Sequence, residues 1–247
     1  MRIIGIIPAR YGSTRFPGKP LAKIGEKTMI RRTWERASQS SLDAVVVATD
    51  DQRIFDEVQG FGGQAVMTRA DHRSGTDRCC EALGLVGEDY DAVVNIQGDE
   101  PFIHPGHIDR VADLIRLPDV RIATLAKPIK IAESLLSSHC VKVVFDREGN
   151  ALYFSRSPLP NVRGASSMEW LQTTDFYQHI GIYGYESEAL REVTALPLGR
   201  LEQAEMLEQL RWLENGYRIR VGVVSGDDSI AIDTPDDLLN IPPELLR

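Results

Sequence analysis

Short runs of apolar, mostly β-branched residues alternate with amphipathic stretches through the first half of the chain. The early runs are nearly continuous in apolar residues, which is typical of strands that are covered on both faces. Amphipathic stretches at 29–39, 51–61 and 106–117 separate them. This order predicts right-handed crossovers and an α/β fold, with a mostly parallel central sheet flanked by helices. The expected strands are 3–9, 44–50, 92–100, 121–126, 141–146, 151–155, 179–185 and 218–224.

The pattern changes between residues 141 and 185, where strand-like runs follow one another with no helical stretch between them. Such a stretch predicts an antiparallel excursion from the main sheet, and residues 157–170 are expected to form a loop. One long helix is expected over residues 200–216, ended by Gly216 as its C-terminal cap. We therefore expect a single domain over residues 1–247, with residues 141–185 inserted as a lid or a dimer arm.

The chain is acidic overall. Its 28 Lys and Arg residues against 36 Asp and Glu residues give a formal net charge of −8, which argues against a general nucleic-acid or anionic membrane surface. Its three cysteines, Cys79, Cys80 and Cys140, have the spacing of neither a disulfide framework nor a zinc site, and we expect reduced thiols. No segment approaches the roughly 20 apolar residues that span a bilayer. These features predict a cytoplasmic protein without membrane insertion.

Residues 6–20, IIPARYGSTRFPGKP, form a basic, glycine-rich loop that no acid interrupts. The loop follows the first expected strand, which is where ligands of open α/β sheets bind. Its backbone N–H groups, together with Arg10, Arg15 and Lys19, predict a cradle for a polyphosphate. It is not a P-loop, because its glycines lie one residue too far apart and a proline follows the lysine, and it lacks the GxGxxG fingerprint. The alternative is a solvated surface loop.

Two carboxylates are expected at the ends of strands. Asp99 and Glu100 follow an apolar run in NIQGDEP, and Asp233 ends another in IAIDTPDDL. We expect Asp99 and Asp233 to converge on one Mg²⁺, which takes carboxylate oxygens together with phosphate oxygens. The motif HPGH at 104–107 resembles a nucleotidylyltransferase signature, but it follows the third long strand rather than the first, so a helix start is favoured. Other acids are expected to open helices: Asp50, Asp51, Asp236 and Asp237.

Seven blocks along the chain carry a resemblance to the 3-deoxy-manno-octulosonate (KDO) cytidylyltransferases, or CMP-KDO synthetases. The opening block is shared with CMP-sialic acid synthetases, and so indicates sugar-activating cytidylyltransferases in general. The later blocks narrow the match, appear in the family's order and span nearly the whole chain. They are IIPARYGSTRFPGKPL, ADHRSGTDR, VVNIQGDEP, ALYFSRSPLP, HIGIYGY, LEQLRWLENG and IDTPDDL.

The resemblance implies a nucleotide-binding fold of the glycosyltransferase-A type, related to the Rossmann fold, as well as a homodimer and Mg²⁺ dependence. The implied reaction is that of CTP with KDO, which gives CMP-KDO and pyrophosphate for the inner core of lipopolysaccharide. The anomeric 2-hydroxyl of the sugar would attack the α-phosphorus in line, and the protein would position two anions and neutralise their charge. Metal-assisted lowering of the hydroxyl's pKa is favoured over a dedicated base.

The resemblance also implies residue roles. Arg10 and Lys19 would hold the triphosphate and Asp99 and Asp233 the metal, and these four are the expected catalytic residues. The nucleotide would be bound by Pro8, Ala9, Arg10, Ser13, Lys19, Arg73, Ser74 and Gly75. The sugar acid would be bound by Gln97, Arg156, His179, Tyr183, Glu208 and Gln209. Arg156 suits a carboxylate chemically, His179 and Tyr183 lie four apart on one strand face, and adjacent Glu208 and Gln209 cannot both point squarely into one site.

Two features depart from the family pattern. Ala231 stands where many members have a glycine two residues before the last aspartate, and residues 161–176 match no quoted block. The 8-amino analogue of KDO is therefore the alternative substrate within the class. The alternative of a different class is a non-catalytic nucleotide-sensing module, which predicts CTP binding without turnover, and the expected metal acids and triphosphate cations disfavour it. The missing fingerprint disfavours an NAD-dependent dehydrogenase.

Overall fold

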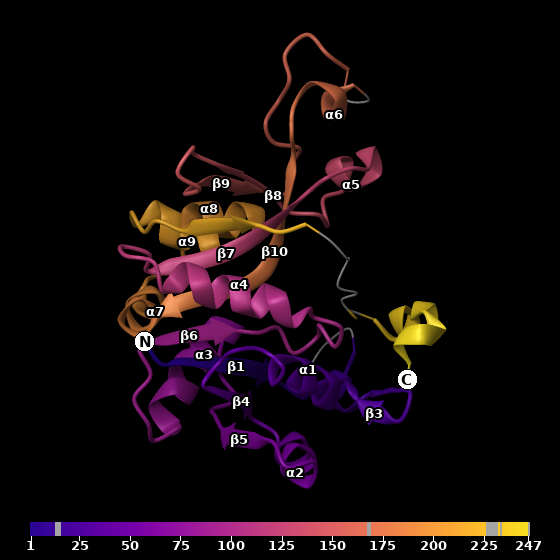
Figure 1. Ribbon diagram of the computed structural model, residues 1–247, viewed down its shortest axis with the longest axis vertical. Coiled ribbons are helices and arrows are strands. Elements are labelled where there is room, and N and C mark those ends of the chain that lie inside the picture. The colour runs from indigo at the N-terminus through magenta and orange to yellow at the C-terminus, as the bar shows by residue number, and fades with distance from the viewer. Residues whose placement is uncertain (13–15, 167–168, 226–231, 233, 247) are drawn as a thin grey trace.

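The computed structural model describes residues 1–12, 16–166, 169–225, 232 and 234–246. Nine strands form one sheet: β1 (Ile3–Ala9), β4 (Ala44–Thr49), β5 (Gln64–Met67), β6 (Ala92–Asn95), β7 (Ile122–Pro128), β8 (Lys142–Phe145), β9 (Ala151–Ser155), β10 (Tyr177–Glu186) and β11 (Arg220–Val223). Seven of them follow the order β11-β7-β10-β6-β1-β4-β5, with β8 attached to β10 and β9 to β8 (Figure 1). A separate antiparallel pair consists of β2 (Lys23–Ile24) and β3 (Lys27–Thr28).

The sheet is parallel where the sequence predicts it. Strands β5, β4, β1 and β6 run parallel to one another, as do β7 and β11. The predicted antiparallel excursion is confirmed in β8 and β9. Strand β10, however, lies antiparallel between β6 and β7, so the end of the inserted stretch is part of the central sheet. Strands β8 and β9 lie at one end of the molecule with α5 (Ala132–Leu136) and α6 (Trp170–Thr173) (Figure 1).

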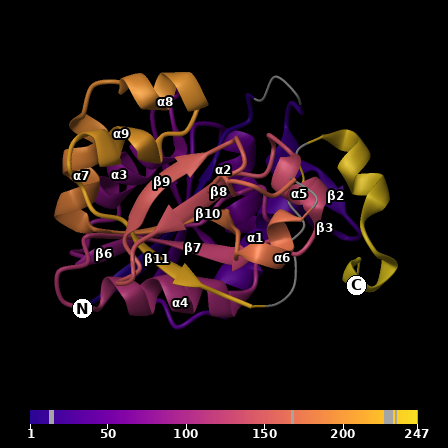
Figure 2. The same cartoon turned by 90° about the horizontal axis from the view of Figure 1, so that it is seen from above.

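Helices cover both faces of the sheet, as the continuous apolar runs predict. Residues Ile3 and Ile7 of β1 face α1 (Met29–Ala37), α2 (Gln52–Gly60) and α4 (Pro105–Ile115). Residues Ile4 and Ile6 face the other side, which carries α3 (Gly75–Leu85), α7 (Ser187–Ala195) and α9 (Gln209–Glu214). Figure 2 shows α4 on one side of the sheet and α3, α7 and α9 on the other. The helix start predicted at HPGH is confirmed, because α4 begins at Pro105.

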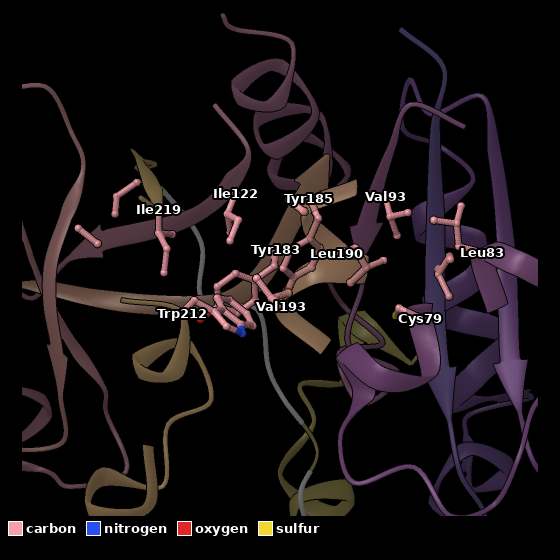
Figure 3. Packing of buried hydrophobic residues seen from close by; sticks show 14 of the residues in the cluster. Cys79, Leu83, Val93, Ile122, Tyr183, Tyr185, Leu190, Val193, Trp212 and Ile219 are labelled. Atoms are coloured by element: carbon pink, nitrogen blue, oxygen red, sulfur yellow. The ribbon is translucent and has the colours of Figure 1, made fainter. Parts of the chain in front are cut away.

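An aromatic cluster fills the core between β10 and α9. The Trp212 ring stands edge-on to the rings of Tyr183 and Tyr185, at centroid distances of 5.1 and 5.5 Å, with Leu190 and Val193 of α7 nearby (Figure 3). Edge-to-face pairs of this kind add roughly 0.5–1.5 kcal/mol each beyond the area that they bury. The cluster fixes β10 against the helices that follow it in the chain.

The helix expected over 200–216 is two helices, and that prediction is wrong. Helix α8 (Arg200–Glu205) ends at Met206, which has a left-handed φ of 53°, and α9 starts three residues later. In one continuous helix Glu202 and Arg211 would project from opposite sides, about 13.5 Å apart along the axis. The break brings them into a buried bidentate ion pair with N–O distances of 2.6 and 2.7 Å. Gly216 follows α9 with φ 82°, as expected of a C-terminal cap.

The C-terminal segment packs beside the first loop rather than on the sheet. Two short 3₁₀ helices, η2 (Pro235–Asn240) and η3 (Pro243–Leu245), lie next to β3 and α1 (Figure 1). The buried Arg32 of α1 donates hydrogen bonds to the carbonyl oxygens of Ile24, Leu245 and Leu246, at 2.9, 2.8 and 2.8 Å. Asp237 accepts from Thr234 in the first turn of η2, as expected of an acid at a helix start.

Candidate active site

A cavity of about 260 Å³ opens where the carboxyl ends of β1 and β6 meet the first turn of α3. This is the edge of the sheet at which the sequence predicts the polyphosphate cradle. The cavity is bordered by backbone as well as side chains, because β1, the loop after β6 and the start of α3 all reach it. Its lining residues are Pro8, Ala9, Arg10, Lys19, Pro20, His72, Arg73, Ser74, Gly75, Arg78, Gln97, Gly98 and Asp99.

The first loop folds back so that Lys19 faces the cavity. Gly18 donates a backbone hydrogen bond to the Tyr11 carbonyl at 2.9 Å and has φ 72°. A Cβ on Gly18 would lie 3.1 Å from the Tyr11 ring, so the turn favours glycine for its conformation and for its close packing. Lys19 then opens the 3₁₀ helix η1 (Lys19–Leu21), and its side chain is only 12% exposed. The alternative of a solvated surface lysine is thereby excluded.

The loop after β6 faces Lys19 across the cavity. The expected strand 92–100 ends at Asn95, and the chain then turns through Gly98, at which a Cβ would lie 2.7 Å from the Pro8 carbonyl oxygen. Gly98 therefore permits close approach of this loop to β1, and it also lines the cavity. Asp99 forms an ion pair with Lys19 at 2.9 Å. Two predicted catalytic residues, 80 positions apart, thus meet directly.

Helix α3 directs its N-terminus at the same cavity. Ser74 is its N-cap and accepts a hydrogen bond from the backbone of Asp77 at 3.1 Å, and Gly75 is the first helical residue. The second half of the block HRSGTDR is therefore the first turn of α3. The exposed N–H groups and the dipole of a helix start favour an anion, so this element adds positive potential beside Arg10 and Lys19.

Two lining side chains were missed by sequence reasoning. Arg78 is buried and donates to the Thr68 hydroxyl at 2.5 Å and to Asp50 at 2.9 Å, so it fixes the end of β4 against α3. His72 is hydrogen-bonded to Glu81 of α3. Both lie in the block ADHRSGTDR, which already contains three predicted nucleotide-binding residues. Their charged or titratable side chains within that motif were the signal that could have identified them.

One of the two predicted metal ligands lies at the cavity. Asp99 lines the cavity, while Asp233, like Ser13, lies outside the described residues. The backbone N–H of Ile232 donates to the Asp99 carbonyl at 3.1 Å, which brings the last motif to this loop. Burial, followed by the charge of Asp99, raises the pKa of Glu100 to about 7. Within the described ranges no three His, Cys, Asp or Glu side chains converge on one point. The Asp99 carboxylate at the cavity is a suitable ligand for Mg²⁺, which proteins bind through one or two carboxylates together with phosphate oxygens.

Of the residues expected to bind the sugar acid, only Gln97 lines the cavity as the structure describes it. His179 and Tyr183 share a face of β10, with ring centroids 5.3 Å apart, although a β-bulge lies between them. The His179 ring is hydrogen-bonded to the Thr124 hydroxyl at 3.0 Å. Burial lowers the pKa of His179 to about 3, so the ring is neutral at physiological pH.

Glu208 links α9 to α3. It stands at the N-terminus of α9 and accepts a hydrogen bond from the Thr76 hydroxyl of α3 at 2.6 Å. Burial raises the pKa of the Glu208 carboxyl. The neighbouring Gln209 is buried, whereas the Glu208 side chain is partly exposed. The Arg156 guanidinium donates to three backbone carbonyls, those of Ser138, Glu205 and Met206.

The fold and the cavity define a class of protein. Cations, a glycine-rich loop and a helix N-terminus gathered at the carboxyl ends of parallel strands are the elements of a nucleotide-binding α/β protein that holds a polyphosphate. No helix among the described residues is long and apolar enough to cross a membrane.

Comparison with known proteins gives the family. The cytidylyltransferase family model matches residues 4–219. A 3-deoxy-manno-octulosonate cytidylyltransferase from Parabacteroides distasonis is 53% identical over 96% of both chains, and one from Thermodesulfovibrio yellowstonii is 49% identical over 96% of both. A CMP:2-keto-3-deoxy-manno-octonic acid synthetase solved with CTP is 42% identical, with a TM-score of 0.90 over 97% of this chain and 96% of that one. The chain belongs to the cytidylyltransferase family, among the 3-deoxy-manno-octulosonate cytidylyltransferases.

More distant structures share the fold alone. A 4-diphosphocytidyl-2C-methyl-D-erythritol synthase from Anaerococcus prevotii is 15% identical, with a TM-score of 0.65 over 100% of this chain and 99% of that one. The predicted nucleotidyltransferase fold is therefore confirmed.

Proposed function

We propose that this protein transfers CMP from CTP to the anomeric hydroxyl of KDO and releases pyrophosphate, as a step toward the lipopolysaccharide inner core. The observation that carries the proposal is the cavity in which Lys19, Arg10 and the start of α3 meet Asp99. Homologues of about 50% identity carry the name of this enzyme, and a relative with a TM-score of 0.90 was solved with CTP.

The residues supply position and charge. Arg10 and Lys19 hold the triphosphate, and the N–H groups at the start of α3, with Pro8 and Ala9, fix the nucleotide. Asp99 and Asp233 would hold Mg²⁺, and the ion when bound would neutralise phosphate charge and favour ionisation of the attacking hydroxyl. Lys19 and Asp99, which pair with each other at 2.9 Å, would be the groups that face the triphosphate and Mg²⁺ respectively. The neutral His179 and Tyr183 present a surface for uncharged hydroxyls.

The assembly and its place in the cell are part of the proposal. The family resemblance is what supports a cytoplasmic homodimer. Light scattering on the purified protein tests this directly, with a mass of 55 kDa expected from two chains of 27.5 kDa.

Pyrophosphate release tests the reaction. The purified protein is given Mg²⁺ and CTP without sugar, with KDO, with 8-amino-KDO and with sialic acid, and the productive mixture is repeated with UTP and ATP. Release that requires CTP and KDO together supports the proposal. Release with 8-amino-KDO alone transfers the same chemistry to the other sugar acid, and CTP binding without any release indicates a nucleotide-sensing module.

A further inference from the structure

A fully buried lysine lies outside the cavity, in the strand between β9 and β10. The ammonium group of Lys142 donates to the carbonyl oxygens of Ser137, Cys140 and Arg156, at 2.8, 2.6 and 2.6 Å. An ammonium has three N–H donors, so carbonyl dipoles satisfy all of them and none goes to a carboxylate. Burying a charge without a counter-ion is costly, which makes a purely structural lysine an expensive choice at this position.

The position of Lys142 relates it to the residues expected to bind the sugar acid. In the sheet Lys142 pairs with Gln178 of β10 on one side and with Ser155 of β9 on the other. The neighbours of these two partners along the chain are His179 and Arg156. Strand β8 therefore lies between the strand that carries His179 and the strand that leads to Arg156. Lys142 is the residue of β8 that pairs with both of these strands.

The Lys142 and Arg156 side chains interlock through the same segment. Arg156 donates to the carbonyls of Ser138 at 3.1 Å, Glu205 at 2.8 Å and Met206 at 3.3 Å. Lys142 meanwhile binds carbonyls on both sides of residue 138 and that of Arg156 itself. Removal of the ammonium would free the segment that holds one edge of the Arg156 guanidinium.

Charge is out of balance at this point of the molecule. Glu205 is the carboxylate that acts on Lys142, and its two oxygens already accept from the Ser155 hydroxyl at 2.7 Å and the Arg156 backbone at 2.9 Å. Burial lowers the pKa of Lys142, as expected of an ammonium without an ion-pair partner. Two cations against one acid favour the arrival of an anion.

We propose that Lys142 is a positioning residue for the carboxylate of the sugar acid: it holds Arg156 in register with His179 and adds the second positive charge that the carboxylate requires. This inference rests on the proposed function. It assigns to a residue outside the recognised blocks the selection of an acidic sugar over a neutral one.

Steady-state kinetics on two variants test the proposal. Lys142→Gln removes the charge but keeps N–H donors, and Lys142→Met removes both. We expect the KM for KDO to rise about 10- to 100-fold in both variants, the range for losing a charged hydrogen-bonding group. The KM for CTP should stay within about twofold, because Lys142 does not line the nucleotide cavity. Lys130, an exposed lysine just after β7, provides the matched control. Lys130→Met should change neither KM.

The wild-type protein provides a test that does not depend on folding of the variants. KDO is compared with its carboxamide, which has the same shape without the charge. A KM that is much higher for the amide is expected, and this preference should shrink in Lys142→Gln. Equal KM values for acid and amide, or an unchanged KM for KDO in both variants, would overturn the inference while leaving CMP transfer intact. Absence of pyrophosphate release from the wild type would reject the proposed function itself.

Discussion

Lys19 is predicted to contribute most to the proposed triphosphate site, since its side chain lines the cavity and is mostly buried. We expect Lys19→Ala to lower kcat/KM. The loss of transition-state stabilisation should be about 2–4 kcal/mol, which is the scale for one preorganised charge donor. Lys23→Ala, an exposed neighbour, is the control. The measurement is pyrophosphate release under CTP-limiting conditions, and an unchanged kcat/KM would return Lys19 to a structural role.

Asp99 is predicted to act through the metal. Asp99→Asn keeps the side-chain shape but removes the charge that Mg²⁺ needs, so turnover should fall to background at every Mg²⁺ concentration. Asp113→Asn, an exposed acid on α4, should leave the Mg²⁺ titration unchanged. Near-normal activity of a folded Asp99→Asn protein would remove this residue from the metal site.

The lowered pKa of His179 predicts that the free energy of unfolding depends on pH. Its pKa is about 3 in the folded protein and about 6.5 when unfolded, so between these values only the unfolded state binds the proton. This site therefore makes the free energy of unfolding fall as the pH is lowered from 6.5 toward 3, by up to about 1.4 kcal/mol per pH unit. His179→Gln lacks this dependence. Urea unfolding at pH 7, 5.5 and 4.5 should show the difference in stability between the two proteins changing with pH, and a constant difference would contradict the assignment.

At the scale of elements, α1 is hydrogen-bonded to the C-terminal segment through one side chain, that of Arg32, so a single substitution can weaken this link. Arg32→Met leaves three carbonyls without their charged donor, and we expect the free energy of unfolding to fall by about 2–3 kcal/mol. Amide exchange should rise at residues 241–246 and stay unchanged in β4. Arg36→Met on the same helix is the control. If exchange near the C-terminus does not respond, the segment is held by its apolar contacts instead.

Elements that follow from local pattern could be predicted from the sequence. Strands β1 and β4 and helices α1, α2 and α4 match, because apolar period and helix starts are local properties. The break at Met206 could not be predicted, since it depends on the Glu202–Arg211 pair across the fold. Strand β10 likewise reads as part of an arm, and only its partners β6 and β7 place it in the sheet.

The candidate site was predictable to the extent that its residues come in motifs. Seven of the eight nucleotide residues line one cavity, and the eighth, Ser13, lies outside the described residues. Arg78 and Lys142 escaped prediction because their importance comes from the carbonyls and carboxylates that tertiary structure brings to them. No local pattern distinguishes such a cation from a solvated one.

At the scale of the whole molecule, the bond between Thr76 and Glu208 joins residues 132 positions apart. It connects α3, whose first residue lines the cavity, with the N-terminus of α9. A double-mutant cycle with Thr76→Val and Glu208→Gln should give a coupling energy of about 1–2 kcal/mol in urea unfolding. Additive effects, with no coupling, would show that the two helices are held together by packing alone.

The place of β10 also affects how the chain can fold while it is being synthesised. Strands β5, β4, β1 and β6 all lie within the first 95 residues and can pair as they leave the ribosome. The open edge of β6 must then wait for β10, whose last residue is Glu186. An unpaired edge in a nascent chain invites aggregation. Translation pauses or chaperone contacts would therefore matter most while residues 96–186 are being added.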